Sequence, residues 1–492
     1  MKKNPSILRW LSILILFLAA LLAIFQLINF SRIRASFFPG TTIAGVDVSG
    51  LSRQQAAERL MLIYSLPVEV RYGDAAIQIK PSNVGFSLDL ETMLAAADQA
   101  RGSSSFWAGF WNYLWNQMPP ATDVPLRASV SEERLRAYLI NEIVPRYDQQ
   151  PTAAMPVPGS TGFTPGKAGT KMDVDRAVIL IQDALRSSTS RIVNLSYNTV
   201  EPPRPSLQTL GVQLRQVIDV SGFDGLTEVY LLDLQTNQEV QVARMNGADL
   251  TPDIAFTAAS TMKIPIMISS FRRMGEPTPQ EALDLMRAMI ELSQNDPADQ
   301  LMEDLMDKTL GPLQVTEDLQ ALGLENTFLA GYFYPGAPLL KRYTTPANSR
   351  TDVDTSPDDY NQTTPAEMGM LLNDLYQCAS NGGGSFAAVF PGEISQSECR
   401  QMIDLLTKNL LPALIPAGIP EGTRIAHKHG WITELDGYVH TYSDAAIIYS
   451  PGGNYILVIY LYHPVQALWD EANQLMADLS QAVYNYYNTS LR

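Results

Sequence analysis

The chain has 492 residues, a length that suits roughly two or three domains, and 46% of the residues are hydrophobic. This hydrophobic content argues against a wholly disordered chain. The 51 acidic and 35 basic residues give a net charge of −16 at pH 7, which argues against binding of DNA or RNA because nucleic acids require basic surfaces.

Residues 10–30, WLSILILFLAALLAIFQLINF, predict a transmembrane helix. The run is uncharged, and at ~1.5 Å per residue it spans a hydrocarbon core of ~30 Å. Basic residues flank it with a slight excess on the N-terminal side, which predicts an N-terminus inside the cell. The alternative is a cleaved signal peptide, but the run is long for one and no small-residue cleavage site follows. We therefore expect residues 1–35 to form a short tail and a single-pass plasma-membrane anchor, with the later residues extracytoplasmic.

Residues 36–200 contain a weak repeat that predicts two related α/β units. The stretch GVDVSGLSRQQAAERL indicates a short strand, a turn and a helix capped by Ser52. Further on, GFSLDLETMLAAADQA and GTKMDVDRAVILIQDA share a pattern that places Asp89 and Asp173 at the N-cap of an amphipathic helix. This pattern resembles the peptidoglycan-binding domain found beside wall enzymes in anchored bacterial proteins. The resemblance covers most of residues 40–200 and implies that peptidoglycan is the partner of this region.

Between the two units, the stretch FWAGFWNYLW predicts an aromatic helix. Trp107, Trp111 and Trp115 recur every four residues and therefore share one helical face. Three interpretations stay open: a platform for stacking sugars, an aromatic belt on the nearby membrane, or a helix buried in a core, which is the favoured one.

The proline-rich stretch VEPPRPS predicts a linker over residues 201–206, because proline breaks helices and central strands. A second domain is expected over residues 207–492. It opens with GLTEVYLLDLQTN and QEVQVARMNG, which indicate two strands joined in a hairpin around residues 235–237.

The stretch FTAASTMKIPIMISSFRRM places Ser260 and Lys263 at the start of a predicted buried helix. Free N–H groups at a helix start stabilise negative charge near Ser260. Lys263 projects from the next turn toward the same side, and burial would lower its pKa until it can take a proton from the serine hydroxyl. About one chance Ser-x-x-Lys is expected in a chain of this size, so the motif needs support from the rest of the chain.

Two further motifs follow in order. Ser293 and Asn295 lie between two predicted helices in AMIELSQNDPADQLM. Lys428 and Gly430 lie on a predicted strand in IAHKHGWI, ahead of two strands that turn at PGG. Ser-x-x-Lys, Ser-x-Asn and Lys-x-Gly are each weak signals, but in this order and in these contexts they form a specific combination.

Residues from about 210 to 490 resemble the class A β-lactamase family of penicillin-recognising serine hydrolases. The segments MIELSQNDPADQLM, LGLENT and TTPAEMGMLLNDL also look like the family's stretches between motifs. The resemblance implies an α+β domain with a mostly antiparallel five-stranded sheet flanked by helices, a separate helical lobe and no metal or cofactor. The lobe must be trimmed, because the stretch from Ser260 to Ser293 is shorter than in typical members.

The family's catalytic roles carry over to three matching residues. Ser260 would be the acylated nucleophile and Lys263 its base. Ser293 would relay a proton to the leaving nitrogen. Such a set is coherent, because cleavage of an amide or lactam needs a nucleophile, an anion cradle and a proton for the departing amine.

The family's substrate-binding roles carry over to four further residues. Asn295 would bind the substrate amide, and Lys428 would meet the substrate carboxylate. Gly430 would let the substrate backbone lie along the strand. The N–H groups of Ser260 and Trp431 would form the oxyanion hole.

Besides the shortened stretch from Ser260 to Ser293, the chain departs from the family at three places. Gln294 replaces the usual Asp, and His429 replaces a Thr or Ser, so one hydroxyl near the substrate carboxylate is missing. The loop RYTTPANSRTDVDTSPDDYNQ contains no Glu, although the family uses one there to activate water for deacylation. The loop offers four acidic residues, namely Asp352, Asp354, Asp358 and Asp359. A solvated acidic loop is the favoured interpretation, so we expect acylation with slow or differently catalysed deacylation.

Two residue groups leave alternatives open. Cys378 and Cys399 either form a disulfide, which an oxidising compartment would permit, or remain two buried thiols. His427, His429 and His440 could suggest a metal, but the family site uses none, and a histidine that lines the substrate cleft is the favoured interpretation.

Together these patterns predict a membrane-anchored, extracytoplasmic serine hydrolase that forms an acyl-enzyme on Ser260 with β-lactams. One alternative is an enzyme of the D-alanyl-D-alanine peptidase type that acts on the cell wall. Another is a catalytically silent protein that binds or senses peptidoglycan.

Overall fold

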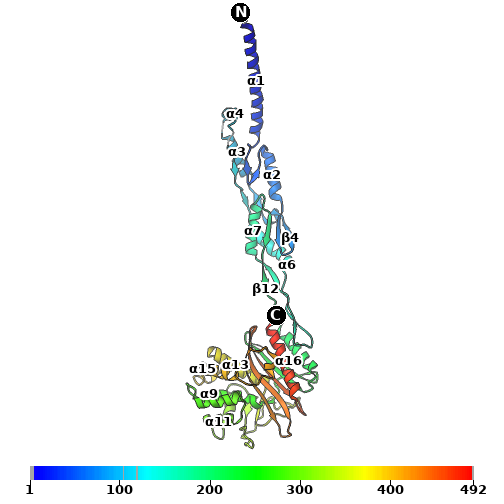
Figure 1. The fold of residues 1–492 in the computed structure, drawn as a ribbon, viewed down its shortest axis with the longest axis vertical. Helices are drawn as coiled ribbons and strands as arrows, with labels where there is room; N and C mark the ends of the chain where they lie inside the picture. The colour runs from blue at the N-terminus through cyan, green and yellow to red at the C-terminus, as the bar shows by residue number, and fades with distance from the viewer. Residues whose placement is uncertain (1–4, 104, 118–119, 490–492) are drawn as a thin grey trace. The chain divides into compact units, whose positions relative to one another are not determined.

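The computed structural model describes residues 5–103, 105–117 and 120–489, which divide into two compact units (Figure 1). The N-terminal unit comprises Met1–Pro151 and Ala168–Glu201, and the C-terminal unit comprises Thr152–Lys167 and Pro202–Arg492. The short strands β8 (Met155–Pro156) and β9 (Phe163–Thr164) therefore lie in the C-terminal unit although they precede the proline-rich stretch. The domain limits 36–200 and 207–492 stay a prediction.

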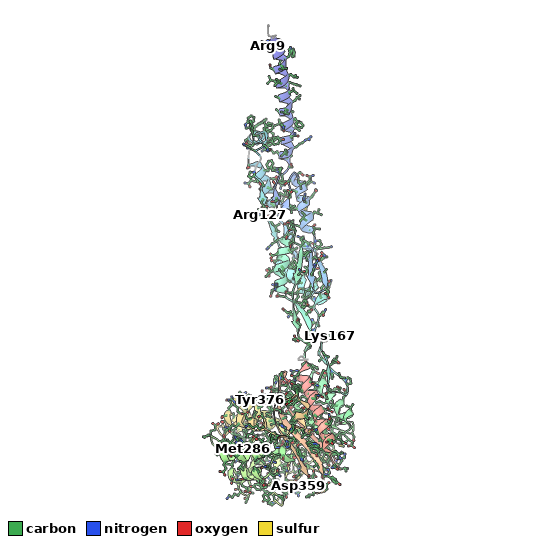
Figure 2. All side chains as sticks on the ribbon, viewed as in Figure 1. Arg9, Arg127, Lys167, Met286, Asp359 and Tyr376 are labelled. Atoms are coloured by element: carbon green, nitrogen blue, oxygen red, sulfur yellow. A yellow bond between two sulfur atoms is a disulfide. The ribbon has the colours of Figure 1, made fainter. Side chains whose placement is uncertain are left out.

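The N-terminal unit begins with the long helix α1 (Pro5–Ala35). Within the described part of the chain, it is the one helix long and apolar enough to cross a membrane, judged by length and composition. Most of its apolar side chains are exposed, including those in the turns that follow Arg9 (Figure 2), whereas Phe30 near its end is buried.

Two hydrophobic cores follow in the N-terminal unit. The first is built around α2 (Arg53–Ser65) and α3 (Leu90–Gly102), and the second around α7 (Val174–Arg186). The strands and short helices of this unit are β1 (Thr42–Ile43), β2 (Val46–Asp47), β3 (Val68–Tyr72), β4 (Ala75–Ile79), η1 (Pro81–Val84), β5 (Ser87–Leu88), β6 (Asp123–Val124), β7 (Ala128–Ser129), α5 (Glu132–Tyr138), η2 (Leu139–Ile143), α6 (Val144–Tyr147), β10 (Gly169–Met172), β11 (Ile192–Leu195) and β12 (Tyr197–Val200). The α/β character and the two-part organisation expected for this region are thus observed.

The predicted helix caps are confirmed. Ser52 Oγ accepts a hydrogen bond from Gln55 N at 3.3 Å, and the Gln55 side chain accepts one in return from Ser52 N. Asp89 and Asp173 each accept a hydrogen bond from the backbone N–H three residues on, at the starts of α3 and α7. These caps fix where each helix begins, because they bind N–H groups that have no partner within the helix.

The aromatic helix α4 (Phe106–Leu114) contains no buried residue. Trp107, Trp111 and Trp115 are all exposed. The favoured interpretation of this segment as a core helix is therefore wrong, since spacing shows which residues share a face but not what covers that face.

The C-terminal unit is built on one antiparallel sheet, which within the described residues has six strands in the order β15-β14-β13-β21-β20-β19. Its strands are β13 (Leu226–Asp233), β14 (Gln238–Met245), β15 (Ala248–Leu250), β19 (Arg424–Thr433), β20 (Val439–Ser450) and β21 (Gly453–Tyr462). The sheet has one strand more than the five expected, and the extra strand is the short β15. The turns predicted at residues 235–237 and at PGG are confirmed between β13 and β14 and between β20 and β21.

Helices cover both faces of this sheet, so successive residues of β13 face opposite cores. Tyr230 and Leu232 face the larger core, and Val229 and Leu231 face the other. Two helices pack on the second face, namely α8 (Leu207–Ser221) and α16 (Trp469–Tyr487). The other elements are β16 (Phe256–Thr257), η3 (Ala259–Met262), α9 (Lys263–Arg273), α10 (Gln280–Ile290), α11 (Asp296–Leu305), α12 (Gly311–Ala321), β17 (Phe328–Leu329), β18 (Asn361–Thr363), α13 (Pro365–Asn381), α14 (Ser385–Val389), α15 (Gln396–Leu406) and η4 (Ile415–Gly418).

A disulfide joins α13 to α15. Cys378 and Cys399 are bonded, with their Cα atoms 5.9 Å apart, and both are buried in the larger core. Of the two alternatives left open by the sequence, the structure therefore has the paired one.

Candidate active site

The turn around Ser260 is held by the neighbouring strand β18. Ala259 has a left-handed backbone with φ 47°, which a residue with a side chain adopts only when its surroundings enforce it. Its N–H donates a 2.6 Å hydrogen bond to Asn361 Oδ1. Ser260 lies in the short turn η3, one turn ahead of α9, and its side chain is half-buried. The helix that follows is buried as expected, so the turn has a rigid base.

Lys263 lies beneath the serine. Its side chain is completely buried, and its Nζ lies 3.0 Å from Ser260 Oγ. The same Nζ donates hydrogen bonds to Ser293 O at 2.6 Å and to Asn295 Oδ1 at 2.8 Å. Phe333 places its ring 5.6 Å from the amine. These contacts fix the amine next to the hydroxyl instead of leaving it free to reach water.

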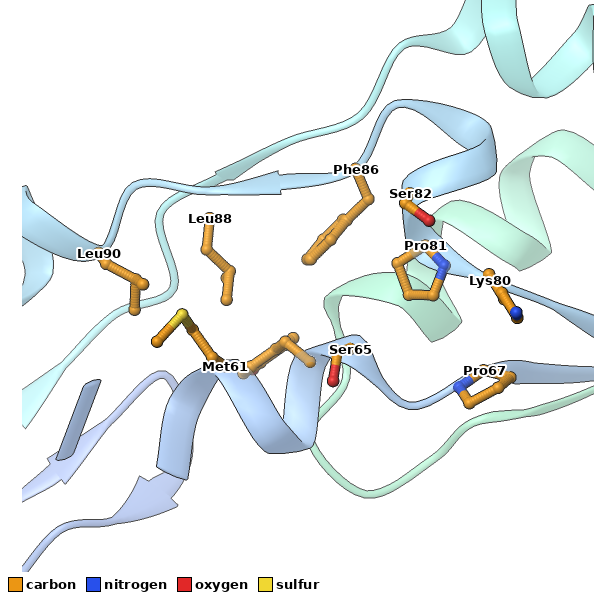
Figure 3. A pocket seen from close by; sticks show the side chains of 10 residues that line it. Met61, Ser65, Pro67, Lys80, Pro81, Ser82, Phe86, Leu88 and Leu90 are labelled. Atoms are coloured by element: carbon orange, nitrogen blue, oxygen red, sulfur yellow. The ribbon is translucent and has the colours of Figure 1, made fainter. Parts of the chain in front are cut away.

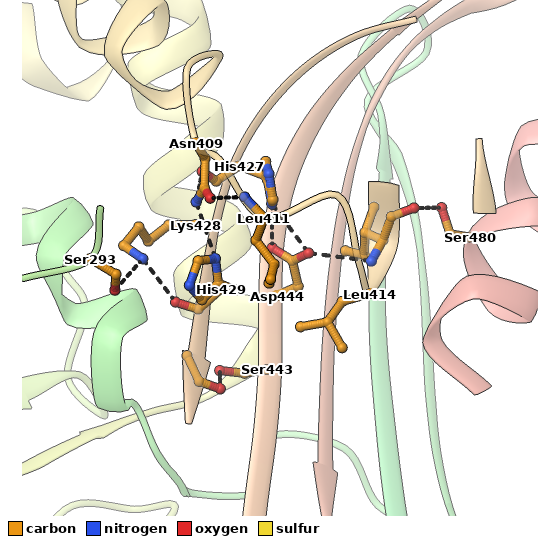
Figure 4. A network of polar contacts seen from close by, with 12 residues as sticks. Ser293, Asn409, Leu411, Leu414, His427, Lys428, His429, Ser443, Asp444 and Ser480 are labelled. Atoms are coloured by element: carbon orange, nitrogen blue, oxygen red, sulfur yellow. Dashed lines mark hydrogen bonds and ion pairs between the residues drawn. The ribbon is translucent and has the colours of Figure 1, made fainter. Parts of the chain in front are cut away.

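Ser293 connects two lysines. It lies in the turn between α10 and α11, again with a left-handed backbone, φ 59°. Ser293 Oγ accepts a hydrogen bond from Lys428 Nζ at 2.8 Å (Figure 4). The same Oγ lies 3.5 Å from Lys263 Nζ. The structure thus brings together Ser260, Lys263, Ser293, Asn295 and Lys428 in one chain of contacts.

The edge strand β19 contacts the Ser260 turn through Gly430. A Cβ atom at this position would lie 2.9 Å from Ala258 O and 3.0 Å from Thr261 N, closer than carbon atoms normally approach. Glycine therefore lets the strand lie directly against the turn. Trp431 follows on the strand, and its ring packs against those of His429 and Trp469.

Burial changes the protonation of both lysines. It lowers the pKa of Lys263 from 10.5 to about 7, although the charge of Asp299 acts in the opposite direction. Burial also lowers the pKa of Lys428, and the charge of Lys263 lowers it further. Near neutral pH Lys263 is therefore partly a free amine, which is the form that can accept a proton.

His429 faces away from the lysine cluster. It is buried, stacks on Trp431, and lies with its Nδ1 3.2 Å from Asn409 Nδ2 (Figure 4). Burial lowers the pKa of His429 to about 2, so the ring is neutral. The other histidines have separate carboxylate partners, with His427 Nδ1 3.0 Å from Asp444 and His440 Nε2 2.8 Å from Asp436. All three histidines are buried, as are Lys263 and Lys428, so the interpretation that one of them lines a substrate cleft stays a prediction.

The four acidic residues of the loop each have a local contact. Asp352 pairs with Arg350 at 2.7 Å and Asp359 with Arg342 at 2.6 Å. Asp354 accepts the N–H of Ser356, and Asp358 accepts the N–H of Tyr360. Asp358 also accepts a 3.0 Å hydrogen bond from Asn361 Nδ2, and burial raises its pKa.

Several residues at the site were not singled out by the sequence. They are Asn361, Asp299, Phe333 and Asn409. Asp299 is buried, accepts the N–H of Phe333 at 2.8 Å, and has a pKa that burial raises to about 6. It lies four residues after Asn295, so helical spacing could have linked these two. The contacts of the other three residues join segments that are far apart in the sequence, so no local sequence pattern could have predicted them.

The N-terminal unit has a cavity of about 530 Å³. Figure 3 shows its walls, which are mostly apolar and come from the end of α2 and from the stretch between β4 and α3. Met61, Phe86 and Leu88 line it, and Lys80 and Ser82 add polar groups.

Comparison with protein families finds two matches. Residues 276–487 match the β-lactamase enzyme family, and residues 77–194 match the peptidoglycan-binding domain. Both resemblances drawn from the sequence are thereby confirmed for these ranges. The first match includes Ser293, Asn295 and Lys428 and begins after Ser260 and Lys263, which the contacts above join to it.

Solved structures with a similar course of the chain include a protein named PBP-A. It is 22% identical, with a TM-score of 0.40, and the match covers 57% of this chain and 97% of that one. An ancestral class A β-lactamase is 23% identical, with a TM-score of 0.40 and coverages of 56% and 98%. A class A β-lactamase of the last common ancestor of Gram-negative bacteria is 22% identical, with a TM-score of 0.40 and coverages of 56% and 97%. No protein with a curated description matches the chain.

Proposed function

We propose that the C-terminal unit is an active-site serine hydrolase of the class A β-lactamase type, acylated on Ser260. The observation that supports this most is the Lys263 amine, which lies 3.0 Å from Ser260 Oγ and has a pKa lowered to about 7. A buried amine of this pKa is a competent general base near neutral pH.

The first half of the reaction uses Ser260 and Lys263. Ser260 Oγ attacks the carbonyl carbon of a lactam or amide, and its proton passes to Lys263 Nζ. The negative charge that develops on the carbonyl oxygen is stabilised by the N–H groups of Ser260 and Trp431. Loss of one such donor typically costs ~10²–10³ in rate.

The second half breaks the carbon–nitrogen bond. Ser293 Oγ, within reach of both lysines, passes a proton to the departing nitrogen and recovers one from Lys263. Asn295 is exposed, and its amide N–H₂ can bind the substrate amide while its oxygen stays on Lys263. Lys428 attracts the substrate carboxylate, and Gly430 keeps β19 close enough to present Trp431.

Deacylation is proposed to be slow. The family's water-activating Glu is missing, and all four acidic residues of the loop have other contacts. A long-lived acyl-enzyme fits a D-alanyl-D-alanine peptidase or penicillin-binding role better than an efficient lactamase. The likeness of residues 77–194 to a peptidoglycan-binding domain favours a wall substrate as well.

The location proposed is the outer face of the plasma membrane. Helix α1 would serve as a single-pass anchor, the N-terminal unit would bind peptidoglycan, and the C-terminal unit would be extracytoplasmic. The disulfide between Cys378 and Cys399 supports an oxidising compartment.

A silent peptidoglycan-binding or sensor protein is the second candidate. It is favoured by the departures at Gln294 and His429. It is opposed by the buried lysine pair, because two buried amines cost stability and a scaffold without chemistry gains nothing from them.

The test is intact mass spectrometry of the full chain in detergent, mixed with benzylpenicillin and followed over time beside a Ser260→Ala variant. We expect an adduct of the mass of penicillin in the wild type alone, and a lasting one. An adduct that disappears while penicillin is consumed would identify a true lactamase. Absence of both adduct and penicillin turnover would contradict the β-lactam proposal and favour the silent protein.

A further inference from the structure

Helix α4 has two apolar faces, which adjoin at Trp107, because its ring contacts those of Phe106 and Phe110. One face is partly buried and carries Phe106, Phe110 and Tyr113. All three rings pack around Phe30 of α1, with ring centroids 5.4 to 5.6 Å away. Tyr113 Oη also donates a 3.1 Å hydrogen bond to Gln26 Oε1. α4 is therefore docked on the last turns of the membrane-length helix.

The second apolar face of α4 has no cover among the described residues. Trp107, Trp111 and Trp115 are 69%, 62% and 67% exposed, and Leu114 is 42% exposed. Patches of large apolar side chains in the open usually mark a contact with a partner or a membrane. The stretch SFWAGFWNYLWNQ carries no charged residue that would keep this face in water.

The position of α4 along α1 indicates what the exposed tryptophan face contacts. Phe30 ends the uncharged run and lies about 20 residues after Trp10, ~30 Å along the helix axis at ~1.5 Å per residue. Arg32 and Arg34 follow at once, and the Arg34 guanidinium lies 5.3 Å from the Phe106 ring. If α1 spans the membrane, α4 lies where the hydrocarbon ends and the headgroups begin. Tryptophan prefers this depth, because its ring is apolar and its N–H can reach polar groups.

We propose that α4 is an interfacial helix whose tryptophan face, formed by Trp107, Trp111, Leu114 and Trp115, inserts into the headgroup region of the outer leaflet. The protein then has two membrane contacts, the spanning helix and this shorter one docked on it. The proposal rests on the proposed anchoring by α1. A helix that lies in the interface beside a spanning helix limits how far the spanning helix can tilt or slide.

The experiment uses the full chain in phosphatidylcholine vesicles that carry bromine atoms on the acyl chains, either close to the headgroups or deep in the bilayer. Bromine quenches nearby tryptophans. A Trp10→Phe background removes the tryptophan of α1. It is compared with the same background carrying Trp107→Gln, Trp111→Gln and Trp115→Gln. The far-ultraviolet circular dichroism spectrum serves as the check that both proteins are folded.

The expected result is a loss of emission in the Trp10→Phe protein, larger with shallow bromines than with deep ones, and no such loss in the variant without the three tryptophans. Single Trp→Gln variants, each expected to lose part of the quenching, keep the test valid if the triple variant does not fold. If bromine does not reduce the tryptophan emission although the protein cannot be extracted from the vesicles, the interfacial helix is contradicted and the α1 anchor is not. Emission that responds to soluble peptidoglycan disaccharide instead of brominated lipid would overturn it in favour of sugar stacking. Release of the protein from the vesicles at alkaline pH would overturn the anchor and the interfacial helix together.

Discussion

The turn around Ser260 and the loop of residues 341–360 both belong to the C-terminal unit, but they use their charged groups in opposite ways. At the turn, two buried lysines are directed at one pair of serine hydroxyls. In the loop, Asp352 and Asp359 form ion pairs with arginines, and both carboxylates are exposed to solvent. Preorganised groups in a dry site stabilise a transition state, whereas solvated ion pairs contribute little.

This difference separates the two halves of the proposed reaction. The groups proposed to form an acyl-enzyme are held together by direct contacts. No loop carboxylate is held in the same way toward the serine. The contrast therefore predicts that substitutions at the turn reduce acylation strongly, and that substitutions in the loop leave the lifetime of the acyl-enzyme almost unchanged.

The largest effect is expected from Lys263→Ala. Removal of the amine removes the base, and loss of a general base typically costs ~10²–10⁴ in rate. The rate constant for adduct formation with penicillin measures it. Lys341→Ala is the matched control, because Lys341 is exposed and lies over the Tyr343 ring. Equal rates in both variants would contradict the assignment of Lys263 as the base.

A smaller effect is expected from Gly430→Ala. The added methyl group would meet backbone atoms at 2.9 and 3.0 Å, so β19 and the Ser260 turn must move apart. Misplacement of reacting groups by about 1 Å can cost ~10²-fold in rate. Gly275→Ala is the control, since nothing lies within 4 Å of a Cβ there. If Gly430→Ala were acylated as fast as wild type, the strand would not position the oxyanion hole.

The dependence on pH is expected to follow Lys263. Its pKa of about 7 leaves the ammonium form in excess below pH 7 and the free amine in excess above it. Acylation should therefore level off above pH ~8 and fall roughly tenfold per pH unit below pH ~6. A stopped-flow profile of acylation from pH 5 to 9 measures this. A rate that is flat down to pH 5 would show that the base has a carboxylate-like pKa.

The smallest effect is expected in the loop. Asp352→Asn, Asp354→Asn and Asp359→Asn should each change the lifetime of the acyl-enzyme less than about twofold. Asp352 and Asp359 form surface ion pairs, which are worth little, and Asp354 caps only the N–H of Ser356. Time-resolved intact mass measures the lifetime. Asp358→Asn is the informative contrast, since Asp358 is tied through Asn361 to the Ser260 turn. If Asp358→Asn is acylated normally but its adduct lives much longer, Asp358 would be the missing deacylating residue. The loop would then also carry a catalytic group, as the turn is proposed to do.

Contacts between residues close together in the sequence could be predicted from it, whereas contacts between distant segments could not. Ser260 and Lys263 are three residues apart on one turn, so their meeting follows from helix geometry. Asn361 reaches Ala259 from about a hundred residues away, and no periodicity records such a contact. The prediction that the tryptophan helix α4 lies in a core was wrong for a different reason. Its spacing gave the correct face, but both faces are apolar, and only the structure shows that α1 covers one of them and leaves the other open.

The shared contact of two lysines with Ser293 limits how many protons the pair can hold. Each ammonium makes the other harder to form, because Lys263 and Lys428 repel one another when both are charged. A substrate carboxylate arriving at Lys428 favours a proton on that amine. When the pair holds a single proton, a proton drawn to Lys428 in this way leaves Lys263 as the free amine. Binding of an anionic substrate at Lys428 would therefore leave Lys263 ready to act as the base. Recognition of the carboxylate and activation of the base would then be the same proton shift.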